Sequence, residues 1–535
     1  AGENITFDKA PSCKGMRFSG WTTDGNDLIT ADELKDMTYS IKTTYYAVYE
    51  PAAGLFKVTV NAGEGKFSDG KTEKTLENVP YGRLTKELEQ PTPNANGLVF
   101  SHYETENGYP VTVIEKDLEK EETLYARYAK PVSTFEDLQN INLAPEQNYV
   151  LINDITAGEN MWGESGLISW TAIGANARNG FSGTFNGNGH IISVSAKSGT
   201  KNNFGYFSKI SGTVYNLSVK GYFSISGTTD ASALGAFASE VTASGKIVDC
   251  QTFIRFSANV KATQKLSVSG SIGVNNGLAD GLMTSASGDI NIDSNTEFTV
   301  GSTVGTNNGS MKNINQSGRG GGVYVTLARS LNCNLGYFVG YNTGVIENCF
   351  SEREITLNLS QGDNVYLENS VFFGGFAGKN DGTIKNSTIL HGKLAYSVSN
   401  VTLFGEKGLY LTYDHYSETP QYVISVVGKD NQGTTHTAKC AIYLDENAVK
   451  KGSTLYEEYT LSEFTAKYPA EAKKIAALRN SIAFESFVSS NNGNTDNCYV
   501  VEDVGTGNGV ELVSSCGFDE LKWNYLSRLH ETVYG

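Results

Sequence analysis

Hydrophobic and polar positions alternate in short stretches between residues 204 and 390, and glycine and asparagine separate these stretches. Segment 339–349 (VGYNTGVIENC) returns as segment 377–387 (AGKNDGTIKNS), with the turn glycine, the turn asparagine, an apolar residue and the closing asparagine in register. Such alternation is typical of strands, and an Asn-Xaa-Gly tripeptide supplies the positive backbone dihedrals of a tight turn. The repeated unit is therefore predicted to be strand, turn and strand.

Looser copies of this unit precede the close pair. The six copies begin at residues 207, 237, 272, 304, 339 and 377, a spacing of about 30–40 residues that is typical of structural repeats. In a solenoid, each strand pairs in parallel with its equivalents in the coils above and below. This predicts one interior column formed by Val214, Ile247, Met311, Ile346 and Ile384, and a second formed by Leu217, Cys250, Ile314, Cys349 and Ser387.

Polar residues stand between the two columns in most copies. Their alignment predicts a ladder of side chains that hydrogen-bond along the stack, built from Asn216, Asp249, Asn313, Asn348 and Asn386. Gly281 interrupts this series, and we interpret the gap as a local irregularity of a natural repeat. Most aromatic rings, such as Phe338 and Phe376, recur at equivalent places and are expected inside the coils.

A more specific pattern precedes the first coil. Residues 133–136 offer a capping box for a short helix. Apolar residues and glycines then follow in the order YVLINDI (149–155), WTAIG (170–174), FSGTFNGNGHI (181–191), FGYF (204–207) and VYNL (214–217). This order resembles the GLUG-motif surface proteins of bacteria over most of residues 132–425. The resemblance implies a right-handed parallel β-helix in secreted or wall-attached proteins, among them adhesin-like chains and non-catalytic regions of immunoglobulin-cleaving metallopeptidases.

The N-terminal section contains a duplication of its own. Segment 15–21 matches segment 97–103, and segment 46–51 matches segment 125–131 with one residue inserted. The pattern resembles Listeria-Bacteroides repeats, which implies small β modules that act as spacers on surface proteins. We expect a partial module at 1–52, a second module at 53–131, and a chain that is an excerpt of a longer protein cut inside a repeat.

Helical signals return near the C-terminus. Thr460 to Glu463 form a second capping box, and Pro469 opens a stretch with helical apolar spacing that is expected to run from 470 to 487. Another amphipathic stretch spans 518–529. We expect these helices to cap the open end of the β-helix, with partner binding as the alternative. The β-helix is therefore predicted at 132–425, and terminal coils with a helical insertion and cap at 426–535, including a last coil near 497–500.

Composition changes the picture mainly through charge. The chain has 42 Lys and Arg against 58 Asp and Glu, a formal net charge of −16, which disfavours nucleic acid and anionic lipid as main partners. No apolar run approaches the roughly 20 residues needed to cross a bilayer, so no membrane insertion is expected within this segment. We expect an extracellular monomer at the cell surface, attached to the cell wall or outer membrane.

The seven cysteines do not have the paired spacing of a zinc site. Cys250, Cys349 and Cys498 occupy one position of the coil, where small buried thiols are the expected interpretation. A bridge between Cys498 and Cys516 is the alternative. No cofactor is implied by any of these residues.

Candidate chemistry is sparse. The six histidines are scattered without a His-Glu-x-x-His pair, and neither a Gly-x-Ser-x-Gly elbow nor a P-loop is present. Because parallel β-helices also host polysaccharide lyases and glycosidases, segment 289–293 (DINID) is the best enzyme candidate. Alternation would place Asp289, Asn291 and Asp293 on one face, where the two carboxylates could flank a glycosidic bond or hold calcium. A solvated outer strand face is the simpler interpretation, because no cluster of basic residues adjoins them.

Exposed aromatic rings are the usual contact for sugars, and Trp162, next to Gly163 in an expected loop, is the ring most expected to be exposed. The favoured hypothesis is a non-enzymatic rod for adhesion or display that binds a host or environmental glycan or protein. A polysaccharide-active lyase or glycosidase is one alternative. A non-catalytic segment of a giant surface peptidase is the other.

Overall fold

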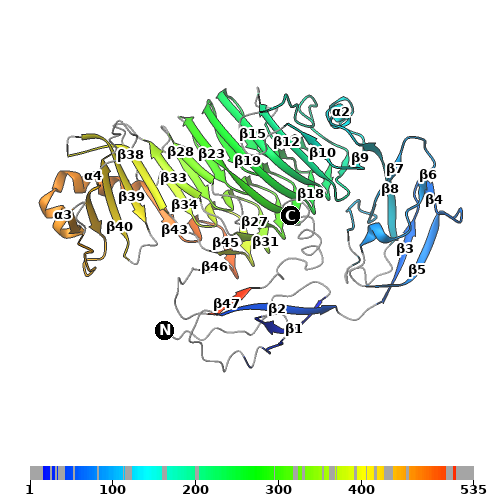
Figure 1. The fold of residues 1–535 in the computed structure, drawn as a ribbon, viewed down its shortest axis with the longest axis horizontal. Coiled ribbons are helices and arrows are strands. Elements are labelled where there is room, and N and C mark those ends of the chain that lie inside the picture. The colour runs from blue at the N-terminus through cyan, green and yellow to red at the C-terminus, as the bar shows by residue number, and fades with distance from the viewer. Residues whose placement is uncertain are drawn as a thin grey trace.

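The computed structural model describes residues 16–23, 27–30, 33, 43–51, 55–80, 84–112, 114, 123–158, 166–198, 204–294, 296–316, 323–327, 332–351, 355–360, 368, 370–390, 395–404, 406–414, 419–426, 438–452, 457–501 and 510–513. Within these ranges the chain is all-β with a few short helices, and most strands stack side by side along one long axis (Figure 1). The stack is a parallel β-helix-like solenoid, as the repeats predicted.

Four parallel sheets run along the solenoid, and each receives one strand from nearly every coil. The first sheet contains β16 (Ala233–Gly235), β20 (Leu266–Ser269), β24 (Phe298–Gly301), β29 (Cys333–Gly336), β34 (Val371–Gly374) and β43 (Ile482–Glu485). The second contains β13 (Phe207–Ile210), β17 (Ala238–Val241), β21 (Ile272–Asn275), β25 (Val304–Asn307), β30 (Val339–Asn342), β35 (Ala377–Asn380) and β44 (Val488–Asn491).

The other two sheets complete each coil. The third contains β9 (Tyr149–Leu151), β11 (Thr184–Asn186), β14 (Thr213–Tyr215), β18 (Lys246–Val248), β22 (Leu278–Asp280), β26 (Ser310–Lys312), β31 (Val345–Glu347), β36 (Thr383–Lys385) and β45 (Asn494–Asp496). The fourth contains β10 (Ile155–Ala157), β12 (Ile191–Ser198), β15 (Ser218–Thr229), β19 (Gln251–Ala262), β23 (Met283–Ser294), β27 (Asn315–Gln316), β28 (Val323–Leu327), β32 (Phe350–Ser351), β33 (Ile355–Ser360), β37 (Thr388–Leu390), β38 (Ala395–Leu403) and β46 (Tyr499–Val501).

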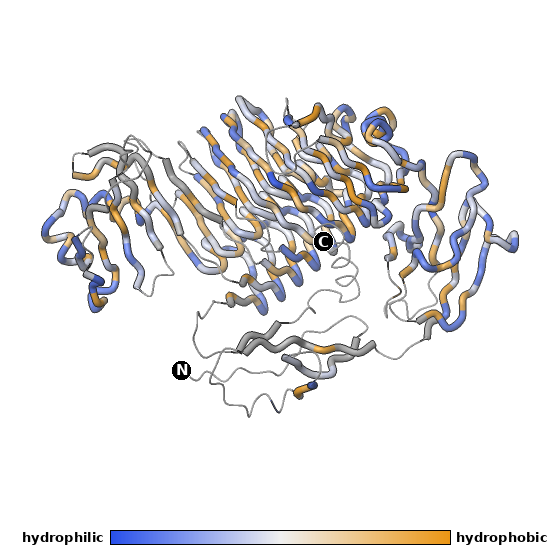
Figure 2. The backbone as a smooth tube through the Cα atoms, viewed as in Figure 1, coloured by the Kyte–Doolittle hydropathy of each residue, from blue (hydrophilic) through white to orange (hydrophobic). Residues whose placement is uncertain are grey.

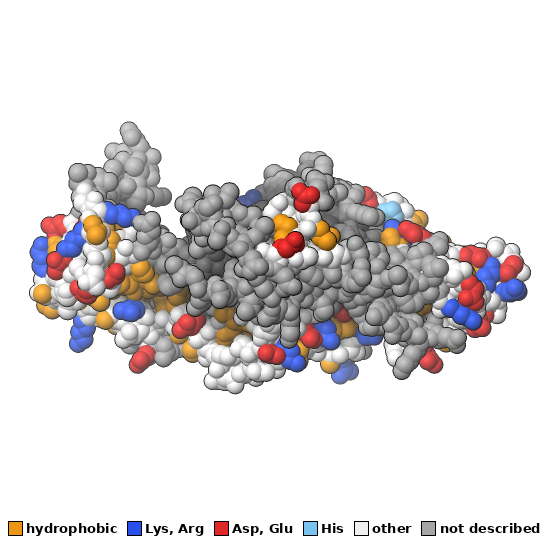
Figure 3. Space-filling model, turned by 90° about the horizontal axis from the view of Figure 1, so that it is seen from below, with side chains coloured by type: hydrophobic (Ala, Val, Ile, Leu, Met, Phe, Trp, Pro, Cys, Tyr) orange, Lys and Arg blue, Asp and Glu red, His pale blue; other side chains and the backbone are white. Residues whose placement is uncertain are grey.

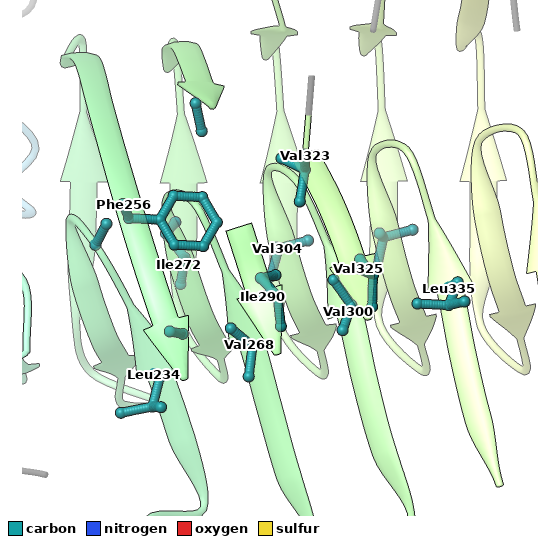
Figure 4. Packing of buried hydrophobic residues seen from close by; sticks show 14 of the residues in the cluster. Leu234, Phe256, Val268, Ile272, Ile290, Val300, Val304, Val323, Val325 and Leu335 are labelled. Carbon is teal, nitrogen blue, oxygen red and sulfur yellow. The ribbon is translucent and has the colours of Figure 1, made fainter. Parts of the chain in front are cut away.

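The predicted interior columns are confirmed. In the third sheet Val214 pairs with Ile247, and the column continues through Ala279 to Met311, Ile346 and Ile384, all fully buried. The second column is buried as well, from Leu217 to Ser387. Hydrophobic positions alternate with polar ones along the strands (Figure 2), and the apolar side chains fill the space between the sheets (Figure 4). Aromatic rings stack in this core, with the Phe338 and Phe376 centroids 4.7 Å apart.

The predicted polar ladder lies at the turn between the third and fourth sheets, and its side-chain hydrogen bonds are confirmed from Asn313 to Asn386. Its members adopt positive φ, from Asn216 at 48° through Gly281 at 71° to Asn386 at 46°, because a single left-handed residue makes a sharp turn that asparagine and glycine tolerate best. The amide of Asn348 donates to Asn313 over 3.3 Å, and Asn386 donates to Asn348 over 3.2 Å. Asn497 extends the ladder by one coil.

A second asparagine ladder lies inside the solenoid. It is formed by the last residue of five strands in the second sheet: Asn275, Asn307, Asn342, Asn380 and Asn491. The first four are fully buried. Each side-chain amide donates to the next asparagine over 2.8 Å. The repeat pattern identified three of these residues only as turn asparagines. Their buried amides are satisfied by one another, which makes the ladder a structural device of the core.

The N-terminal module continues the third sheet. It comprises β3 (Leu55–Asn61), β4 (Gly65–Lys66), β5 (Glu73–Pro80), η1 (Thr85–Glu87), β6 (Thr92–Pro93), β7 (Val99–Glu104) and β8 (Thr123–Val132). Strand β8 pairs in parallel with β9, and side chains join the module to the flank of the coils: Tyr109 donates to Asp280 over 2.8 Å, and Thr112 donates to Asp249. A separate small sheet contains β1 (Met16–Thr22), β2 (Thr43–Pro51) and β47 (Val510–Val513).

A short helix follows the module. Helix α2 (Phe135–Asn140) begins after the N-cap Thr134, whose partner in the capping box is Asp137. The predicted box at 133–136 is therefore wrong by one residue. The 3-10 turn η3 (Ile141–Leu143) follows directly, and Leu138 and Ile141 are buried in the main core.

An insertion of antiparallel strands and helices interrupts the last coil. Strand β38 pairs in parallel with β33, but β39 (Glu406–Asp414), β40 (Gln421–Val426) and β41 (Ala438–Tyr443) continue the sheet in antiparallel order, so parallel coils do not extend to residue 425. Strand β42 (Glu457–Thr460) leads into α3 (Leu461–Lys467) and α4 (Pro469–Ser481). The capping box of Thr460 and Glu463 is confirmed.

The helix before the last coil is shorter than predicted, because the chain returns to the parallel sheets after it. Helix α4 ends at Ser481, and Ile482 pairs with Val371 as β43 begins the last coil. The predicted helix up to 487 is therefore too long. Phe464 and Leu478 are buried in the main core, whereas the stretch at 518–529 lies outside the described residues. No helix in the part of the chain that the structure describes is long and apolar enough to cross a bilayer.

Candidate functional site

The predicted acidic strand lies in the fourth sheet, in the middle of the stack. Strand β23 alternates as expected: Ile290 and Ile292 are buried, Asp289 is exposed, and Asn291 and Asp293 are partly exposed. Figure 4 shows Ile290 directed into the packed interior, together with Val325 of the next strand. The polar side chains of β23 therefore stand on the outer face of a rigid sheet.

The strand register gives these residues their neighbours. On one side Ser257 pairs with Asp289, Asn259 with Asn291 and Lys261 with Asp293. On the other side Tyr324 pairs with Asp289, and Thr326 pairs with Asn291. We name the outer set formed by these residues the β23 face: Ser257, Asn259, Lys261, Asp289, Asn291, Asp293, Tyr324 and Thr326.

Tyr324 is the residue that sequence reasoning missed. Its side chain is 47% exposed, which makes it a large ring open to solvent in the middle of a polar surface. Adjacent strands lie about 4.8 Å apart, so the ring and the Asp289 carboxylate are close neighbours. The alternation of Val323, Tyr324 and Val325 was a usable signal for an outward ring, but only the pairing of β28 with β23 brings it to Asp289.

The side chains at the centre of this face have no competing partner in the part of the chain that the structure describes. Within the described residues, no hydrogen bond or ion pair engages the side chain of Asp289, Asn291 or Tyr324. A ligand could therefore bind them without first breaking a contact to any other described residue. Carboxylate, amide and hydroxyl groups beside one open aromatic ring are suited to a polyhydroxylated molecule.

A shared calcium ion is disfavoured by the geometry of the strand. Asp289 and Asp293 are four residues apart, which corresponds to about 13 Å, whereas calcium binds its oxygens at about 2.3–2.6 Å. Lys261 also places a cation in register with Asp293. Among the described ranges, no group of three His, Cys, Asp or Glu side chains is arranged to hold a metal ion.

The same distance bears on the glycosidase alternative. Paired catalytic carboxylates stand about 5–5.5 Å apart in retaining enzymes and about 6.5–9.5 Å apart in inverting enzymes. The spacing of Asp289 and Asp293, about 13 Å along the strand, exceeds both. Lys261 is the one cation among the residues of the β23 face, so the basic cluster that a lyase would require is not formed by this face.

Other predicted features fall in different places. Trp162 lies outside the described residues. His190 Nδ1 lies 3.1 Å from Asp154 Oδ1 beside the turn glycines. Cys250 and Cys349 are buried free thiols, and burial raises the pKa of Cys250 to about 12. Cys498 is a half-buried free thiol, and Cys516 lies outside the described residues.

A second polar cluster offers a contrast to the β23 face. On the outside of the first and second sheets, Glu297 accepts from Lys265 at 3.0 Å and from Asn334 at 3.3 Å. Tyr341 donates to Asp381 over 2.6 Å, and burial together with this bond raises the pKa of Tyr341 to about 12. These groups satisfy one another, so this cluster is an internal network. Figure 3 shows acidic and basic side chains interspersed over the described parts of the molecule's lower side.

Comparisons with known proteins give little to build on. No family model matches the chain, and no curated protein matches it. A crystal structure of a Bacteroides ovatus protein, provisionally described as an immunoglobulin A1 protease, aligns at 13% identity and a TM-score of 0.36, over 64% of this chain and 88% of that chain. A structure described as IgA1 protease aligns at 14% identity and a TM-score of 0.30, over 80% of this chain and 32% of that one. At these scores the likeness carries no conclusion.

Proposed function

We propose that this chain is a non-enzymatic rod that acts outside the cell, at a bacterial surface, and binds glycan through the β23 face. The observation that carries the proposal is the register of β28 on β23, which places the exposed Tyr324 opposite Asp289 on an outer sheet face. Residue types alone do not distinguish a binding face from a solvated one. An exposed ring beside unengaged polar groups is the combination that a sugar recognises by stacking and hydrogen bonding.

The solenoid supplies what such a site needs from a scaffold. Ile290 and Val325 are fully buried, so the backbone beneath Asp289 and Tyr324 is held by the core. A rigid surface loses little conformational entropy when a ligand binds, which favours affinity from few contacts. A glycan that presents several copies of one sugar would gain further by multivalent attachment to a surface that carries many rods.

The test is a glycan and mucin array probed with the full chain, with calcium and with chelator, followed by titration of the best ligand. Saturable binding that is lost in Tyr324→Ala and weakened in Asp289→Asn is the expected result, independent of calcium. The matched control is Leu143→Ala, which removes an 82% exposed apolar side chain elsewhere. Equal binding by Tyr324→Ala and the control would contradict the proposal.

The enzyme alternative is tested in the same samples by measuring released reducing or unsaturated sugar. We expect none, because of the wide spacing of the two aspartates and the single cation on the face. Product that disappears in Asp289→Asn would replace a binding role with catalysis. The alternative of a non-catalytic segment in a large surface peptidase remains compatible with a glycan-binding rod, since both assign this region a non-catalytic role.

A further inference from the structure

Charged side chains alternate in sign along one outer row of the third sheet. Its members stand opposite one another in successive coils, in the order Asp280, Lys312, Glu347, Lys385 and Asp496. Each charge therefore has an opposite charge on the neighbouring strand, which is the favourable cross-strand arrangement. Removing any of the three inner coils would bring like charges together. The row favours this order of coils, and it ends on an acid.

The last coil leaves an edge that no other described strand pairs with. Strands β44 and β45 are the terminal strands of the second and third sheets in the part of the chain described by the structure. Asn491, Asn494, Thr495 and Asp496 are exposed there. This edge differs from the other end, where residues 173 and 181 bridge to β13 and β8 pairs with β9.

One residue of this edge, Thr495, directs its backbone groups away from the stack. The N–H of Asn494 donates to Gly382, and the C=O of Asp496 accepts from Asn386, so both groups point to the coil below. Because successive residues of a strand direct their backbone groups to opposite sides, the N–H and C=O of Thr495 point to the open side. They are placed to pair with one more strand.

Side chains on the edge also have a direction. In the buried ladder each amide donates to the coil above, and Asn491 accepts from Asn380 over 2.8 Å. The amide N–H of Asn491 is therefore presented upward, where the described chain provides no further coil. Asp496 is the last member of the alternating row, so the next residue in the row, opposite Asp496, would be a cation.

We propose that the edge formed by β44 and β45 binds an extended polypeptide strand of another molecule, which continues the stack in parallel. The strand that fits carries an amide acceptor opposite Asn491 and, five residues later, a lysine or arginine opposite Asp496. Head-to-tail stacking of two copies does not provide it, because the first coil is covered. Thr495 replaces the apolar residue of the lower coils, so the uncovered end tolerates water and the association is reversible.

The chain contains its own probe for this site. Segment 377–387 carries Asn380 and Lys385 with the spacing of Asn491 and Asp496. A fluorescent synthetic peptide of this segment, titrated into the full chain and followed by anisotropy, is expected to bind saturably. Asp496→Lys should weaken binding about fivefold, since an attraction between exposed charges becomes a repulsion. A peptide with Lys385→Glu should prefer that variant, which restores the opposite charges.

Thr495→Pro tests the backbone pairing. It removes an N–H that has no partner among the described residues, and proline is tolerated on an edge strand, so the melting temperature should change little while peptide binding is lost. Glu106→Lys, in an exposed turn of the N-terminal module, is the control for charge and should bind the peptide normally. The proposal is overturned by the absence of saturable binding, by binding that neither Thr495→Pro nor Asp496→Lys changes, or by self-association through this edge in light scattering, which would identify a second copy as the occupant.

Discussion

The inner and outer faces of the same coils differ in how their polar groups are used. Inside, Asn342 is fully buried, accepts from Asn307 and donates to Asn380, each over 2.8 Å. Outside, Asp289 and Tyr324 face solvent and have no partner among the described residues. The inner polar groups hold the stack together, and the outer ones are available for binding. Stability and function should therefore respond to different substitutions.

The largest loss of stability is expected inside. Asn342→Ala removes the 2.8 Å partner of the buried Asn307 amide and of the buried Asn380 carbonyl, which then keep only bonds of 3.3–3.5 Å. This should lower the free energy of unfolding by about 3 kcal/mol. Urea denaturation followed by circular dichroism measures it. Asn491→Ala, at the exposed end of the same ladder, is the matched control and should cost well under half as much. Equal effects at the two positions would show that burial does not set the contribution of the ladder.

The turn ladder should be next in size. Asn348 has a φ of 55° and both donates and accepts within the ladder. Asn348→Ala should cost about 2 kcal/mol, because it combines an unfavourable left-handed backbone with lost hydrogen bonds. Asn348→Gly removes only the hydrogen bonds and should recover about half of that loss. If glycine and alanine were equally destabilising in thermal melts, the backbone argument would be wrong.

A smaller effect is expected on the outer charged row. Glu347→Lys places a lysine between Lys312 and Lys385 and should cost about 1 kcal/mol at low ionic strength. The loss should shrink in high salt, because exposed charges are screened. Glu347→Gln is the control that removes attraction without adding repulsion. If the loss of unfolding free energy did not depend on salt, its cause would be a packing defect and not repulsion between the charges.

Much of the division between inner and outer positions could be predicted from the sequence, because aligning two repeats shows which of their residues lie opposite each other in the stack. Aligning 339–349 with 377–387 was enough to place Ile346 and Ile384 in one column and Asn348 and Asn386 in one ladder. Local signals were less reliable at boundaries: the first capping box is displaced by one residue, and α4 ends at Ser481, where β43 rejoins the stack.

The remaining features depend on contacts that no local pattern contains. Asn342 precedes a glycine turn, which hides its burial, since only the stacked coils enclose it. The antiparallel strands β39 to β41 have the same alternation as coil strands, so sequence alone does not distinguish their direction. Tyr324 becomes part of the candidate site only through its pairing with Asp289. The two aspartates were found by alternation, but their partner ring was not.

The central claim is that the outer face binds while the inner face holds the fold. The most direct measurement compares glycan affinity and melting temperature in Tyr324→Ala. We expect binding to be lost while the free energy of unfolding stays within about 0.5 kcal/mol of the unmodified chain, as for other exposed substitutions. Retained affinity, or lost affinity accompanied by a clearly lower melting temperature, would contradict the account.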